Sequence, residues 1–167
     1  MKFSGQLRMQ GFSLVEVMVA SAVLAIILLV GVPSMLELNR DARMSAQADQ
    51  ILGLLGLARM EAIKERRDFR LCPATTPDTA TACSASANDW SNGILVMDGT
   101  TVFRRLSIPA GITINSAVTE VRFTGTLGSS TAAVTMTICA QGRRQQQIGV
   151  ALSGRVAKRV NASVTCT

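Results

Sequence analysis

The chain has 167 residues, of which 17 are Lys or Arg and 11 are Asp or Glu, so its formal net charge at pH 7 is +6. It contains no histidine, which excludes nucleophilic sites built on Ser-His or Cys-His pairs. The four cysteines include no C-x-x-C pair, and without histidine the usual zinc sites are excluded as well. We therefore expect a protein that is not an enzyme and that holds no cofactor or metal.

The first element is an apolar stem, residues 12–34, that contains one acidic residue. From residue 12 to residue 32 the only charged residue is Glu16. About 20 apolar residues can span a bilayer, and a carboxylate inside it costs a few kcal/mol, so Glu16 is expected to have a function and a partner. Lys2 and Arg8 precede the stem without an acid, in agreement with the excess of positive charge on the cytoplasmic side of membrane segments.

Two plainer explanations of the stem are open. An ordinary secretory signal also has a basic start, but this apolar run is longer than usual and no clean A-x-A cleavage site follows it. A simple membrane anchor fits the length, but it gives no reason for Glu16 or for Gly11 directly before the stem. We therefore favour an explanation that accounts for both residues.

A long helix is expected to continue past the stem. Proline removes one backbone donor and clashes with the preceding turn, so Gly31 and Pro33 predict a kink or a locally melted turn. Residues 35–67 are amphipathic, with apolar residues at three- and four-residue spacing. These residues are Leu38, Met44, Ala48, Ile51, Leu52, Leu55, Ala58, Ala62 and Ile63.

After residue 67 the pattern indicates β-strands. The candidates are residues 69–72, 93–97, 101–106, 112–114, 120–124, 133–139, 147–152 and 155–164, with a loop at 73–92. Asp98-Gly99 predicts a type I′ hairpin turn. The aromatic residues expected in the core are Phe69, Trp90, Phe103 and Phe123. We expect an α+β fold in which one long N-terminal α-helix packs on an antiparallel β-sheet.

The four cysteines are expected to form disulfides. The stem directs the rest of the chain out of the cytoplasm, where thiols pair. Four cysteines allow three pairings, and the sequence alone does not choose between them. We favour Cys72–Cys83 with Cys139–Cys166, because these pairs close short loops that stabilise by roughly 3 kcal/mol each in the entropic model.

The start of the stem resembles a known signature. Gly11-Phe12-Ser13-Leu14-Val15-Glu16 matches the G|F-[ST]-L-x-E motif of type IV prepilins and of the pseudopilins of type II secretion. The resemblance implies that prepilin peptidase cuts between Gly11 and Phe12, and that Phe12 is then N-methylated. It also implies that Glu16 pairs with the terminal amine of an adjacent subunit during assembly. The chain would then comprise a leader (1–11), a transmembrane and filament-core helix (12–34) and a periplasmic pilin domain (35–167).

The rest of the chain is similar to the FimT/FimU/GspH group of minor pilins and pseudopilins. The similar segments are Leu54-Leu55-x-Leu57-Ala58-Arg59-x-Glu61-Ala62-Ile63, Leu71-Cys72-Pro73, Trp90-Ser91-Asn92-Gly93 and Gly154-Arg155-Val156. The resemblance implies a minor type IV pilin that primes assembly and lies at or near the pilus tip, in a pilus used for twitching, adhesion or DNA uptake. Other minor and major pilins would be its partners, and it would lie in the inner membrane before it enters an extracellular pilus. The alternative is a minor pseudopilin of a type II secretion system, in a periplasmic pseudopilus.

The C-terminal part of the chain is basic. Residues 121–167 contain no acid and six basic residues, which are Arg122, Arg143, Arg144, Arg155, Lys158 and Arg159. Some FimT-type members bind DNA through a C-terminal G-R-x-R motif. Here Gly154-Arg155 matches that motif, but Ala157 replaces its second arginine.

The resemblance makes DNA a candidate partner. Its candidate contacts are Arg143, Arg144, Arg155, Lys158 and Arg159. In a strand, Arg155, Ala157 and Arg159 would share one face and Lys158 would lie on the other. Without nearby aromatic residues, any contact would be to phosphates. We favour two plainer roles over DNA binding: a solvated basic edge that prevents pairing between sheets, or contact with a partner pilin.

Overall fold

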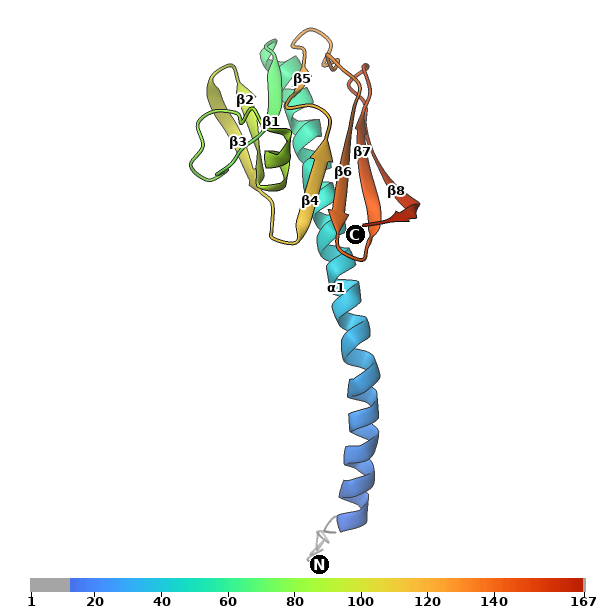
Figure 1. The fold of residues 1–167 in the computed structure, drawn as a ribbon. Helices are drawn as coiled ribbons and strands as arrows, with labels where there is room; N and C mark the ends of the chain where they lie inside the picture. Colours follow the sequence, from blue (N-terminus) through green and yellow to red (C-terminus); the bar gives the residue numbers. More distant parts are fainter. Residues whose placement is uncertain (1–12, 167) are drawn as a thin grey trace, which may run out of the picture. The chain divides into compact units, whose positions relative to one another are not determined.

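The computed structural model describes residues 13–166, without the side chains of residues 30, 33 and 34. Helix α1 (Leu14–Glu65) is followed by strands only, apart from the short 3-10 helix η1 (Ala87–Ser91). The chain divides into two compact units, Met1–Asn39 and Arg40–Thr167, and α1 contributes to both. The second unit is called the domain below. The predicted α+β fold, with a long N-terminal helix on antiparallel strands, is confirmed (Figure 1).

The stem part of α1 begins with a capped turn. The Glu16 backbone N–H donates a hydrogen bond to Ser13 Oγ at 3.2 Å. The helix then passes Gly31 and Pro33 without a break, so the locally melted turn that we expected there is absent. A proline removes only one backbone hydrogen bond, and the turns on both sides keep theirs. Over the described part of the chain, no helix combines the length and the apolar character needed to cross a bilayer.

The domain part of α1 contributes one apolar face to the core. Its buried residues are Met44, Ala48, Ile51, Leu55, Ala58 and Ala62. Their three- and four-residue spacing places them on one side of a helix, as predicted. Two residues assigned to the same face are instead exposed, Leu38 by 65% and Ile63 by 45%. Ile63 lies near the end of α1, where the loop at Gly128 packs against its side chain.

The strands form two four-stranded sheets rather than the single sheet we expected. Sheet A has the order β3 (Thr101–Ser107), β2 (Gly93–Asp98), β1 (Phe69–Pro73), β5 (Val121–Phe123), and sheet B has the order β4 (Ile112–Ser116), β6 (Val134–Ala140), β7 (Arg144–Val150), β8 (Val156–Thr165). All pairings are antiparallel. Figure 1 shows the two sheets side by side along the domain part of α1. One core contains side chains from α1 and from both sheets.

Several local predictions need correction. The β2–β3 loop consists of Gly99 and Thr100, of which only Gly99 has a positive φ (58°). Type I′ requires two positive φ values, so the predicted turn type is wrong, and glycine at the first position is typical of type II′. Phe103 is 41% exposed because β3 is an edge strand, although its ring meets that of Phe69 edge-on at 5.5 Å. Strand β7 begins at Arg144, three residues earlier than predicted.

The loop at 73–92 covers the outer face of sheet A. Cys72, Ala74, Leu95 and Met97 are buried there in a second, smaller cluster. The structure joins Cys72 to Cys83, which ties the loop to β1, and Cys139 to Cys166, which ties the end of β8 to β6. These are the pairs that the short-loop argument favours.

Candidate functional site

The start of the stem places Glu16 at the third helical position. Gly11 and Phe12, the expected cleavage and methylation site, lie outside the described residues. Glu16 is exposed, and its backbone N–H is capped by the Ser13 hydroxyl. The positive end of the helix dipole favours a carboxylate at this place. The pattern Ser13-x-x-Glu16 is that of a capping box, a local signal that our sequence analysis missed.

The stem has an almost continuous apolar surface. From Leu14 to Leu38 the large apolar side chains that the structure describes are between 51% and 77% exposed. An apolar surface of this length indicates contact with lipid or with other proteins. The stem therefore has the surface of a segment that lipid or other proteins cover.

Two of the five predicted DNA contacts are neutralised within the chain. Arg143 forms an ion pair with Asp41 of α1 at 3.3 Å, and only 15% of its side chain is exposed. Lys158 pairs with Asp49 of α1 and also donates to Ser45 Oγ at 3.3 Å. Both bases therefore face α1 and already have a carboxylate as partner. Nothing local in the sequence indicates these contacts, because the partners lie 102 and 109 residues apart.

Arg155, directly before β8, and Arg159 of β8 lie on the face opposite to Lys158. With Ala157 they line a shallow cavity of about 310 Å³ on the outer face of sheet B, next to Gln147 and Thr135. The alternation predicted for this strand is thus confirmed, because Lys158 faces α1 instead. Within residues 13–166, neither guanidinium group makes an ion pair or a hydrogen bond. Arg144 lines a different cavity, with Asp41 and Gln146, so the five bases do not form one surface.

The glycine before Arg155 has a structural role. Gly154 has a φ of +76°, and a Cβ there would lie far inside van der Waals distance of the Gly128 carbonyl oxygen. Arg59 of α1 donates from Nε to that same carbonyl at 3.0 Å and from Nη2 to the Ser153 carbonyl at 3.2 Å. Arg59 thereby joins two loops to the helix. Gly154 is needed for this packing, whatever Arg155 binds.

The comparisons with known families agree with this geometry. A family model described as Type II transport protein GspH matches residues 47–154, which is most of the domain. A second family model, described as Prokaryotic N-terminal methylation motif, matches residues 7–32. None of the curated proteins matches the chain in sequence.

Solved structures with this fold are minor pilins and a minor pseudopilin. A crystal structure of the type IV minor pilin FimU of Pseudomonas aeruginosa aligns with 77% of this chain and 98% of its own, at 17% identity and a TM-score of 0.58. A second crystal form of FimU gives a TM-score of 0.55. The minor pseudopilin EpsH from the type 2 secretion system of Vibrio cholerae aligns with 72% of this chain and 99% of its own, at 12% identity and a TM-score of 0.54. At these identities the likeness shows a shared pilin fold.

Proposed function

The chain belongs to the GspH family, and from that premise we propose that it is a minor type IV pilin that primes assembly and lies at or near the pilus tip. The observation that carries the proposal is the pair of matches, with a methylation motif at residues 7–32 and a GspH domain at residues 47–154. One part of the chain supplies a processed stem, and the other supplies the pilin domain. A structural subunit needs both.

The proposed mechanism starts with cleavage between Gly11 and Phe12. It creates an α-amine four residues before Glu16, whose carboxylate is exposed in the first turn of α1. In a helical assembly the amine of one stem can neutralise the Glu16 carboxylate of the next, which offsets the cost of burying both charges. The exposed apolar side chains of the stem then become covered by neighbouring stems.

Before assembly, we place the protein in the inner membrane as a single-pass protein with its domain in the periplasm. The methylation motif supports this placement, because such motifs mark exported, membrane-held precursors. The two disulfides agree with it, because disulfides form and persist outside the cytoplasm.

Processing is tested with Gly11→Val in the native host. We expect this variant to remain as a heavier precursor, because the larger side chain obstructs access of the peptidase to the scissile bond. Gly53→Val is a matched control, since Gly53 is an exposed helical glycine and a Cβ added there would meet nothing within 4 Å. Complete cleavage of Gly11→Val would disprove the leader assignment.

Assembly is tested with Glu16→Val. We expect the variant to be cleaved normally but to be depleted from purified filaments, because the amine of the adjacent subunit loses its partner. Glu16→Asp keeps the charge and should retain part of the incorporation. Normal incorporation of Glu16→Val would contradict the proposed pairing.

The alternative function is that of a minor pseudopilin in a type II secretion system. The description of the family model and the fold of EpsH favour it. Deletion of the gene separates the two functions. A minor pilin is expected to be required for surface pili, whereas a pseudopilin is expected to be required for the release of folded exoproteins while pili remain.

A second candidate function is DNA binding on the outer face of sheet B. Arg155 and Arg159 favour it, since their guanidinium groups share one face of β8 and have no partner within the described residues. We expect Arg155→Gln/Arg159→Gln to weaken DNA binding and to reduce its salt dependence. Lys158→Gln, on the face toward α1, is the control. Undetectable binding of the wild-type protein at low salt would reject this function.

A further inference from the structure

A cavity beside α1 is lined by hydrogen-bond donors without an acidic residue. It has a volume of about 620 Å³ and lies between α1, residues 109–111 of the β3–β4 loop, and the end of β6. Helix α1 contributes Arg40, Arg43, Gln47 and Gln50 to its wall. Apolar atoms of Ala46, Pro109 and Ile112 complete the wall. The lining therefore combines two positive charges with apolar side chains and contains no acid.

The donors of this cavity are not satisfied by the chain itself. Gln47 is only 5% exposed, and its Nε2 has no hydrogen-bond partner within the described residues. An unpaired buried amide donor destabilises the fold, because it has lost its hydrogen bonds to water without replacement. Arg40 and Arg43 are exposed, and within residues 13–166 neither guanidinium group makes an ion pair or a hydrogen bond. The Gln47 amide and the guanidinium groups of Arg40 and Arg43 therefore all lack a hydrogen-bond acceptor within the described residues.

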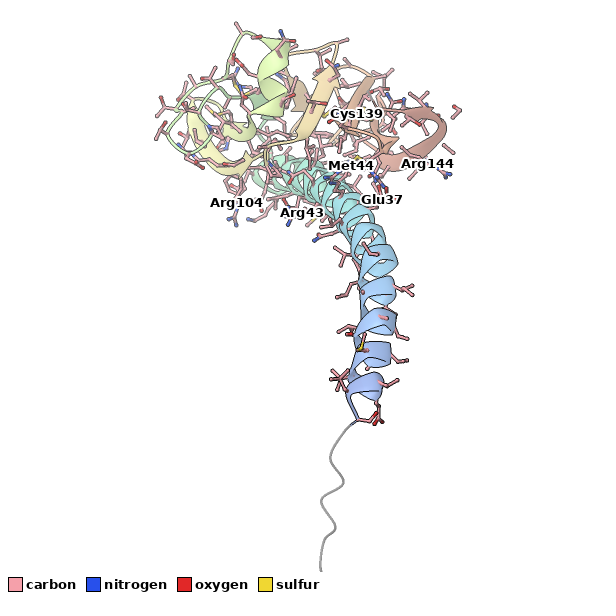
Figure 2. The ribbon with its side chains drawn as sticks, turned by 60° about the horizontal axis from the view of Figure 1, so that its bottom comes forward. Glu37, Arg43, Met44, Arg104, Cys139 and Arg144 are labelled. Carbon is pink, nitrogen blue, oxygen red and sulfur yellow. A yellow bond between two sulfur atoms is a disulfide. The ribbon has the colours of Figure 1, made fainter. Side chains whose placement is uncertain are left out.

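The acidic residues Asp41 and Asp49 of α1 already form ion pairs within the domain. Asp41 and Asp49 point toward β7 and β8, where they pair with Arg143 and Lys158. Figure 2 labels Arg43 beside α1 and Arg144 on the side of sheet B. Arg43 lines the cavity described here, whereas Asp41 and Arg143 line another. Over the described residues, the chain therefore supplies no acceptor for Gln47 Nε2 or for the guanidinium groups of Arg40 and Arg43.

We propose that this cavity binds the carboxylate of an acidic side chain from a companion subunit of the filament. Guanidinium groups bind carboxylates through two parallel hydrogen bonds, and both Arg40 and Arg43 line the cavity. The apolar wall suits the methylene groups of a glutamate or aspartate side chain. The inference rests on the proposed function in one respect, namely that the source of the carboxylate is another subunit.

The position of the cavity in the chain favours a protein as the source. Arg40 follows Leu38 by two residues on the same helix, and Leu38 ends the exposed apolar stretch that neighbouring subunits would cover. Arg40 and Arg43 follow this stretch along α1, so a subunit that extends beyond Leu38 would reach them. An acid at that point of its surface meets two unpaired positive charges, whereas a basic residue would be repelled.

The first experiment measures carboxylate binding by the purified full-length chain in detergent. The probe is the glutamate derivative Ac-Glu-NH₂, and the neutral Ac-Gln-NH₂ has the same shape. We expect the NMR signals of the Gln47 amide and of the Arg43 Nε–H to shift with the first probe only. Arg40→Glu/Arg43→Glu should abolish the shifts. Gln47→Glu should do so as well, because it places a carboxylate inside the cavity. Equal shifts with both probes, or none with the glutamate probe, would overturn the proposal.

The second experiment identifies the source of the carboxylate in cells. We expect Arg40→Glu/Arg43→Glu to lower the amount of the protein in purified filaments at least tenfold. Arg104→Glu, an exposed β3 residue outside the cavity, should leave it unchanged. An acid-to-lysine substitution in another subunit should restore incorporation of the double variant. Normal incorporation of the double variant would overturn the companion-subunit source even if the glutamate probe binds.

The two experiments separate failure of the site from failure of the proposed function. If the wild-type chain binds the probe but never enters filaments, the proposed function is wrong and the carboxylate site stands. If the chain enters filaments but does not bind the probe, the site is wrong and the function stands.

Discussion

Replacement of Gly154 by alanine should destabilise the domain much more than the same replacement at Gly142. Both glycines have a left-handed backbone, with φ of +76° and +73°. A Cβ at Gly142 meets nothing within 4 Å, whereas at Gly154 it would clash with the Gly128 carbonyl and lie 2.9 Å from Arg59 Nε. Gly142→Ala therefore measures the backbone strain alone, which costs roughly 1–2 kcal/mol. Gly154→Ala adds the clash to the same strain.

The clash has a definite energetic consequence. Relief requires the Gly128 carbonyl to move, and this carbonyl accepts the Arg59 Nε hydrogen bond at 3.0 Å. Loss of a hydrogen bond to a charged group costs about 1.5–3 kcal/mol. We therefore expect a total of about 2.5–5 kcal/mol for Gly154→Ala, against roughly 1–2 kcal/mol for Gly142→Ala. For a domain of this size, each kcal/mol lowers Tm by about 3–4 °C.

The assay is thermal unfolding of the purified, oxidised protein, followed by circular dichroism. The expected fall in Tm is about 10 °C or more for Gly154→Ala and about 5 °C for Gly142→Ala. Hydrogen exchange at residues 125–130 should increase only in the Gly154 variant, because only that change displaces the loop. Equal losses of Tm in the two variants would refute the argument from close packing.

Three further predictions concern the Arg59 hydrogen bonds, the Cys139–Cys166 disulfide and the packing of two phenylalanines. Arg59→Met should lower the free energy of unfolding in urea by about 2–3 kcal/mol, because two loop carbonyls lose a charged donor; full recovery by Arg59→Lys would contradict the two-carbonyl bridge. Cys139→Ser/Cys166→Ser should lower the free energy of unfolding in guanidinium by about 3–4 kcal/mol. Reduction of Cys139–Cys166 in a Cys72→Ser/Cys83→Ser variant, which keeps only that bond, should lower it by the same amount, and an unchanged free energy would contradict the prediction. Phe69→Ala should lower the free energy of unfolding by about 3–5 kcal/mol. Phe103→Ala should lower it much less, because the Phe103 ring is partly exposed. Equal decreases in the two variants would be inconsistent with the edge position of β3.

Local patterns in the sequence determined the order and type of most elements. Three- and four-residue spacing placed Met44, Ala48 and Leu55 on one buried helix face, because a helix repeats every 3.6 residues. Alternation in β8 separated Arg159 from Lys158 in the same way, because a strand repeats every two. These periods depend only on neighbouring residues, so they can be read without the fold. The motif Gly11-Phe12 to Glu16 is equally local, and it led to the family.

Contacts between distant segments were decided only by the tertiary structure. The ion pair between Lys158 and Asp49 joins residues 109 positions apart in the sequence. Lys158 is therefore not a free positive charge but connects β8 to α1. The division of the strands into two sheets, which leaves Phe103 on an edge, depends on which strands meet. The unsatisfied donor of Gln47 exists only because residues 109–111 and β6 close a cavity beside it. The physical reason is the same in each case: the free energy of a charge or a polar group depends on what surrounds it in space, and that is set by the packing of distant segments.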